Sequence, residues 1–281
     1  MKKRTIAKVL ATSVLALAAS ASQAEVVNAW IYTLNLEWIP DSAQFSQGQN
    51  VAGYPGSTTA DKEVLSWGAK GANYKNAPNN GYNRSALEIT VPTATSWVYT
   101  NGNAVSANMF THYNAPIYEV YPSLEYAQLA VTIELALPGS NTTYSFGQKV
   151  FDVYFKETLN DGKQCAWGLC DDDIFAIIVS SPTDPTLDRF TESFIHDGYE
   201  YTFNYFDTFA TLQPLSTAVC AEVGILNNAC YGFTTPEDAK TAVHFSFSMT
   251  ATPIPEPETY AMMLAGLGIV GAIARRRRNA V

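Results

Sequence analysis

The stretch Leu129-Ala-Val-Thr-Ile-Glu-Leu-Ala-Leu137 places a large apolar side chain at every second position. Successive side chains of a β-strand point to opposite faces of the sheet, so this pattern predicts a strand with one buried face. The next residues, Pro-Gly-Ser-Asn, are those that end strands in turns. The same alternation recurs at 151–155, 199–205 and 243–249.

Repeated alternating segments of this kind predict an all-β protein, an antiparallel β-sandwich of jelly-roll-like type. Ile174–Val179 is apolar throughout, which favours a strand covered on both faces. No stretch between the two termini keeps a convincing helical period. The chain has 281 residues, 47% of them hydrophobic and 15% charged, so it is long enough to bury the core of such a domain.

The N-terminus has the parts of a secretory signal in order. Met1-Lys2-Lys3-Arg4 is basic, and Val9–Ala19 is apolar but short for a membrane span. Small residues then lead to Ala24. This order predicts a signal peptide at 1–24, cleaved after Ala24, and therefore an exported protein.

The C-terminus carries a second signal. Ala261–Ala274 has no charged residue, and as a helix it would be about 21 Å long, against about 30 Å for the hydrocarbon core of a bilayer. We therefore expect a short transmembrane helix that holds the membrane only marginally. The cluster that follows would keep the C-terminus on the cytoplasmic side and consists of Arg275, Arg276, Arg277 and Arg278.

An extended peptide precedes this segment, because Pro253, Pro255 and Pro257 remove backbone donors and restrict the chain. The order of Pro255-Glu256-Pro257, an apolar segment and an arginine cluster resembles the PEP-CTERM sorting signal. The resemblance implies recognition by an exosortase, a membrane-embedded cysteine protease, followed by removal of the tail. It also implies a Gram-negative producer of extracellular polysaccharide.

These signals divide the chain into a signal peptide at 1–24, a secreted sandwich domain at 25–252 and a sorting tail at 253–281. Anchoring in the inner membrane would then be transient. A permanent tail anchor is the alternative. The final location would be the cell surface or the medium, reached through the inner membrane and periplasm.

The charge of the exported part limits its partners. Between Glu25 and Ala274 there are 9 basic and 26 acidic residues, a net charge of −17. Such a surface repels phosphate backbones, so we expect no nucleic-acid partner. Neutral sugars, cations and other proteins remain as candidates.

Four cysteines enter an oxidising compartment if the chain is exported: Cys165, Cys170, Cys220 and Cys230. Three pairings are formally available, and the local ones, Cys165 with Cys170 and Cys220 with Cys230, are favoured by their closeness in sequence. A four-thiolate zinc site is the alternative, although nine residues between Cys220 and Cys230 fit its usual spacing badly. We expect no metal and no cofactor.

A second resemblance lies in the first half of the chain. Thr111-His112-Tyr113-Asn114, followed by Ala-Pro-Ile, matches the Thr-His-x-Asn signature of one family of PEP-CTERM proteins. Leu65-Ser-Trp-Gly68 and Arg84-Ser-Ala-Leu87 are similar to segments of that family and of the related choice-of-anchor sandwich domains. The resemblance implies secretion and a sandwich, and it implies no established enzymatic activity.

His112 is the most prominent candidate site residue. Its ring could contact a sugar hydroxyl or bind a metal, or it could fix a loop carbonyl while Asn114 adopts a turn conformation. The structural role is favoured, because the sequence shows no adjacent histidine or carboxylate partner. Asp171-Asp172-Asp173 could ligate calcium, but a solvated strand entrance is favoured there.

Aromatic residues form 12% of the chain and suggest a surface on which sugar rings stack. The hypothetical platform consists of Trp67, Trp97, Tyr99 and Tyr113. No nucleophile elbow, zinc-binding helix motif or phosphate loop is present in the sequence. The leading hypothesis is therefore a non-enzymatic surface or matrix protein associated with exopolysaccharide, ahead of a carbohydrate-binding module and a matrix hydrolase.

Overall fold

The computed structural model describes residues 25–49, 52–53, 55–75, 83–158, 164–165, 168–169, 172–178, 189–226, 229–255 and 257–278. The chain divides into two compact units. The larger unit comprises Asn28–Ser193 and Thr202–Thr250. The smaller unit comprises Met1–Val27, Phe194–Tyr201 and Ala251–Val281.

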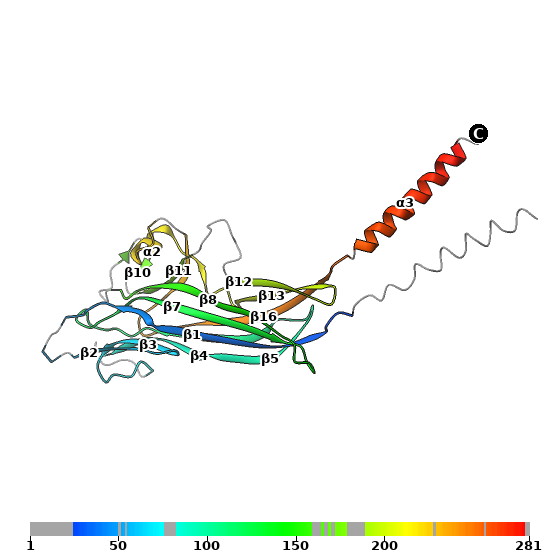
Figure 1. Ribbon diagram of the computed structural model, residues 1–281. Coiled ribbons are helices and arrows are strands. Elements are labelled where there is room, and N and C mark those ends of the chain that lie inside the picture. Colours follow the sequence, from blue (N-terminus) through cyan, green and yellow to red (C-terminus); the bar gives the residue numbers. More distant parts are fainter. Residues whose placement is uncertain are drawn as a thin grey trace, which may run out of the picture. The chain divides into compact units, whose positions relative to one another are not determined.

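Two antiparallel seven-stranded sheets form a sandwich, which confirms the predicted fold class (Figure 1). The first sheet has the order β14 (Gln213–Pro214), β15 (Cys230–Thr235), β11 (Asp173–Ile178), β8 (Thr143–Lys156), β7 (Leu124–Ala136), β1 (Ala29–Phe45) and β5 (Thr93–Tyr99). The second has the order β12 (Arg189–His196), β13 (Tyr199–Asp207), β16 (Lys240–Pro253), β6 (Val105–Tyr113), β4 (Arg84–Val91), β3 (Val64–Ala69) and β2 (Gly56–Ala60). A separate short pair joins β9 (Gln164–Cys165) to β10 (Gly168–Leu169).

The alternating stretch that predicted the sandwich lies in β7, between β1 and β8. Leu129 pairs with Trp38 of β1 on one side and with Phe151 of β8 on the other. Its alternate apolar residues are buried, as the period of two requires.

Aromatic contacts between the sheets form the core of the larger unit. Ring centroids lie 4.9 Å apart for Tyr32 of β1 and Phe247 of β16, and 4.6 Å apart for Phe146 of β8 and Phe203 of β13. These distances are typical of favourable aromatic pairs, so the sandwich is closed by ring packing as well as by area burial.

The outer face of β11 is covered by a short helix that the sequence did not predict. Helix α2 (Thr217–Glu222) begins at the N-cap Ser216, whose hydroxyl accepts a hydrogen bond from the Val219 N–H at 3.3 Å. The helix residues pack on the alternate β11 side chains Ile174 and Ala176, which are fully buried. The prediction that the apolar run beginning at Ile174 is covered on both faces is confirmed for its described residues, 174–178, while Val179 lies outside them. Six residues give too short a helix for its periodicity to show in the sequence.

In the smaller unit, helix α3 spans Pro257–Arg278 and includes the segment 261–274 that was expected to be helical. Proline suits the first helical position because a backbone N–H there would have no acceptor within the helix, so its absence in proline costs no hydrogen bond. The apolar side chains of Leu264, Leu267 and Val270 are exposed. None of the helices in the described part of the chain is long and apolar enough to span a membrane.

Gly68 allows β3 to approach the start of β4. Its φ of +120° is a conformation that other residues rarely adopt, and an added Cβ would lie 2.6 Å from the Asn83 carbonyl oxygen. Gly71 also has a positive φ, +83°, but nothing lies within 4 Å of its added Cβ.

We expect Gly68→Ala to lower the free energy of unfolding by about 1–3 kcal/mol more than Gly71→Ala, because only the first adds a backbone clash to the strain. Denaturant unfolding of both variants measures the difference. Equal losses would contradict the role of this close approach.

Candidate functional site

Several strands of the larger unit bring polar side chains into its apolar interior. His112 is on β6, Glu157 directly follows β8, and Asp173 begins β11. Glu237 lies in the turn between β15 and β16, and Trp67 comes from β3. Residues separated by up to 170 positions in the sequence therefore meet at one place.

The strand period explains why these groups point inward. His112 lies two residues after Phe110, and Asp173 lies two residues before Phe175. The two phenylalanine rings meet between the sheets with centroids 5.3 Å apart, so the polar side chains that share their faces are also internal. His112 and Asp173 are fully buried.

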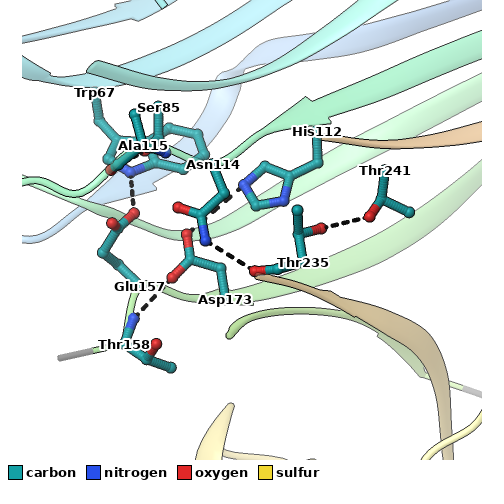
Figure 2. A network of polar contacts seen from close by, with 10 residues as sticks. All are labelled: Trp67, Ser85, His112, Asn114, Ala115, Glu157, Thr158, Asp173, Thr235 and Thr241. Atoms are coloured by element: carbon teal, nitrogen blue, oxygen red, sulfur yellow. Dashed lines mark hydrogen bonds and ion pairs between the residues drawn. The ribbon is translucent and has the colours of Figure 1, made fainter. Parts of the chain in front are cut away.

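Two hydrogen bonds fix the carboxylates (Figure 2). The indole N–H of Trp67 donates to Glu157 Oε2 at 2.6 Å, and the Thr158 N–H donates to Asp173 Oδ1 at 2.9 Å. His112 Nε2 lies 3.7 Å from Asp173 Oδ2, which is beyond hydrogen-bond length. The second oxygen of Asp173 thus faces the imidazole without bonding to it.

Aromatic rings enclose the imidazole of His112. The Trp67 ring stacks on it with a centroid distance of 6.3 Å, and Phe155 meets it edge-on at 5.0 Å. Among the described residues, neither ring nitrogen has a hydrogen-bond partner. Burial lowers the pKa of His112 to about 3, so the ring is neutral at ordinary pH.

The carboxyl groups are shifted in the opposite direction. Burial raises the pKa of Glu157 to about 7, against the opposing effect of the hydrogen bonds from Trp67 and Asp173. Burial, followed by the charge of Glu157, raises the pKa of Asp173 well above its ordinary value. Charged carboxylates this close in an apolar interior require compensation, either by a proton or by a cation.

A metal ion is one such compensation, and the geometry permits it. One oxygen from each of Glu157, Asp173 and Glu237 lies within 4.8 Å of the others. A cavity of about 270 Å³, lined in part by Glu157 and Thr158, provides an approach to this cluster. We refer to Glu157, Asp173 and Glu237 as the carboxylate cluster.

The Thr-His-x-Asn segment also ties strands together. The Asn114 amide donates to the Thr235 carbonyl at 2.8 Å, which links the end of β6 to the end of β15. Ser85 of β4 exchanges hydrogen bonds of 3.2 Å with both backbone groups of Ala115. These bonds connect segments of both sheets around the carboxylate cluster.

The structure corrects two expectations about His112. It has a carboxylate neighbour, Asp173, which is 61 positions away and therefore invisible in the local sequence. Its ring nitrogens also do not bind a loop carbonyl within the described residues, because the ring lies among aromatic side chains. Full burial removes it, together with Thr111 and Asn114 of the same segment, from any surface that contacts glycans.

The aromatic platform is also different from the expected one. Trp67 is fully buried and acts as the donor to Glu157, so it cannot stack on a sugar. Trp97 and Tyr99 are exposed by 48% and 61%, and they share one face of the edge strand β5. Tyr113 is half-buried and packs against Tyr74.

The acidic run and the cysteines had mixed outcomes. Asp173 is buried in the interior, so the expected solvated strand entrance is wrong for this residue, while Asp171 lies outside the described residues. The Cys220–Cys230 disulfide is confirmed and joins α2 to the first residue of β15. The pairing of Cys165 with Cys170 also lies outside the residues that the structure describes.

Glu157 and Glu237 were not singled out from the sequence. For Glu157 a signal exists, because it continues the alternation of Phe151, Val153 and Phe155 by one more step. For Glu237, a turn residue, no pattern in the sequence indicates proximity to the other two.

The tail provides the deciding comparison. Residues 253–278 match the PEP-CTERM protein-sorting motif. This chain carries an exosortase sorting signal. It is therefore an exported protein, directed through the membrane to the cell surface or secreted. No characterised protein and no solved structure matched the chain.

Within this motif, Pro255 is exposed directly before α3, and Pro257 begins the helix. Arg275 and Arg276 are exposed near its end. Glu256 lies outside the described residues, as do Ala24 and the rest of 1–24.

The elevated pKa of Glu157 predicts a pH dependence. A folded-state pKa of about 7, above the ordinary 4.5, stabilises the fold fully below pH 4.5, and this contribution is lost as the pH rises through 7. In buffer with a chelator, the unfolding free energy of the parent should therefore fall relative to Glu157→Gln between pH 4.5 and 7.

Denaturant unfolding across this pH range measures the difference, with Glu134→Gln, an exposed change of the same charge, as the control. A constant difference between parent and Glu157→Gln would contradict the shift.

Proposed function

We propose that this protein is a non-catalytic component of the surface or extracellular matrix that associates with exopolysaccharide after sorting by an exosortase. The observation that carries the proposal is the sorting signal at 253–278 behind a β-sandwich. We further propose that 1–24 is a signal peptide cleaved after Ala24. Membership of the Thr-His-x-Asn family, with a relation to choice-of-anchor domains, belongs to the same proposal.

Anchoring by the tail would be transient. The exposed apolar side chains of α3 favour an apolar environment, and Arg275 and Arg276 favour the polar side of a membrane. Pro255 lies in an exposed, non-helical position just before the helix, where a protease can bind an extended peptide. Cleavage near this point would release the sandwich from the membrane.

The tail proposal predicts the C-terminus of the mature protein. Mass spectrometry of the exported form from its producer should find a C-terminus upstream of Ala261, without the arginine cluster. Replacement of Pro255 and Glu256 by alanine should leave the tail attached and retain the protein in the inner-membrane fraction. Exported parent protein that still ends at Val281 would contradict this prediction.

Glycan binding is a second candidate function, supported by the outer face of β5. Trp97 and Tyr99 are exposed two positions apart, and Val98 between them is buried. Polar side chains lie on the same face: the hydroxyl of Thr95 hydrogen-bonds with the hydroxyl of Thr33 of β1 at 3.2 Å. Aromatic faces beside hydroxyl groups suit the two sides of a sugar ring.

We expect Trp97→Ala and Tyr99→Ala each to weaken binding to the producer's own polysaccharide about fivefold, equivalent to about 1 kcal/mol for one aromatic contact. Co-sedimentation of the exported protein with that polysaccharide measures the change. Phe209→Ala, which removes a 70% exposed ring after β13, is the matched control. Equal binding by all three variants would contradict the β5 surface.

A matrix hydrolase is a third and weaker hypothesis. Carboxyl pairs of glycosidases are separated by about 5 Å or more and contact the substrate. Asp173 is completely buried, so it has no access to a polysaccharide chain. This geometry supports the non-catalytic proposal.

A further inference from the structure

Glu157 and Asp173 lack positively charged partners within the part of the chain that the structure describes. Among the described residues, no lysine or arginine forms an ion pair with Glu157 or Asp173. The imidazole Nε2 of His112 is 3.7 Å from Asp173 Oδ2, which is beyond hydrogen-bond length. The hydrogen bonds from Trp67 and Thr158 each satisfy one oxygen and do not cancel a charge.

Further oxygen atoms around the cluster also lack hydrogen-bond donors. When both carboxyl groups are charged, Asp173 Oδ2 and Glu157 Oε1 have no hydrogen-bond donor among the described residues, and Asn114 Oδ1 has none either. Asn114 is 98% buried, and Figure 2 shows its side-chain oxygen directed toward the Asp173 carboxylate while its amide group faces Thr235. Buried acceptors are normally satisfied, so an excess of them at one point indicates a group that accepts electron pairs from several oxygens at once.

A divalent cation meets this need, and its dimensions fit. Two ligand oxygens that share one Ca²⁺ at about 2.4 Å can be up to about 4.8 Å apart. The oxygens of Glu157, Asp173 and Glu237 lie within 4.8 Å of one another. The cavity of about 270 Å³ that reaches Glu157 and Thr158 gives a hydrated ion a route to them.

The ligand types select the ion. Three carboxylates and a carboxamide oxygen are hard donors, the set that calcium prefers over zinc or copper. We propose that Glu157, Asp173 and Glu237 bind one calcium ion, with the side-chain oxygen of Asn114 as an additional ligand. His112 would remain outside the ligand set, because its Nε2 lies 3.7 Å from Asp173 Oδ2 without a hydrogen bond.

The test uses the mature exported protein after treatment with a chelator. Calorimetric titration with CaCl₂ should give one site per chain, with a Kd of roughly 10⁻⁴–10⁻³ M, as in extracellular calcium modules. At ten times the Kd, calcium should raise the folded-to-unfolded ratio about elevenfold in denaturant unfolding.

Glu237→Gln should weaken calcium binding at least tenfold while leaving the metal-free fold intact, because Glu237 is a half-buried turn residue. Glu119→Gln is the matched control, since Glu119 is exposed and lines the same cavity. Asp173→Asn should abolish calcium binding, provided that this variant folds. If it does not fold, the calcium affinity of Glu237→Gln decides whether the carboxylate cluster is the binding site.

Absence of calcium uptake by the parent would overturn the proposal and leave a shared proton as the compensation. Equal binding by the parent and Glu237→Gln would overturn it as well. Titrations with MgCl₂, MnCl₂ and ZnCl₂ compare the affinity of the site for other divalent ions. Tighter binding of zinc than of calcium would overturn the assignment to calcium.

Discussion

The burial of the Asp173 carboxyl group beside the half-buried Glu157 is the constraint to which the surrounding structure responds. The indole of Trp67 donates to Glu157, and the backbone of Thr158 donates to Asp173. Removal of either donor would leave a carboxyl oxygen without a hydrogen bond and lower the free energy of unfolding by about 1–3 kcal/mol, or by more if the carboxyl group is charged. The hydrogen bonds of Asn114 and Ser85 fix the strands around this centre, so the Thr-His-x-Asn segment supports the cluster from the second sheet.

The tail and the sandwich perform separate tasks. The sorting motif at 253–278 determines where the protein goes, through an extended peptide and a helix with exposed apolar side chains. The sandwich has two features of another kind: an exposed aromatic pair on β5 and an internal cluster of carboxyl groups. Trp97 and Tyr99 on the edge strand β5 are exposed and therefore accessible to a partner, whereas the internal cluster bears on stability. Neither feature involves residues of the sorting signal at 253–278.

Properties set by local sequence were predictable, and those set by packing were not. Alternation in Leu129–Leu137 correctly predicted β7, because the side-chain period of a strand follows directly from backbone geometry. The apolar run at 174–179 correctly predicted a strand covered on both faces. Trp67 resembled a surface aromatic in sequence, yet strand pairing turns it inward. His112 and Asp173 meet only because β6 and β11 lie on facing sheets, a long-range relation that spacing along the chain does not encode.

Terbium luminescence tests most directly whether the carboxylate cluster binds a calcium-like ion. Tb³⁺ occupies calcium sites, and its emission is sensitised by an indole within a few ångströms. Trp67 donates to Glu157 at 2.6 Å, so it would lie beside the ion. The account predicts saturable emission on excitation of tryptophan, displaced by Ca²⁺ and lost in Trp67→Phe, with the folded state verified by circular dichroism. No saturable emission from the folded parent, or undiminished emission from Trp67→Phe, would contradict it.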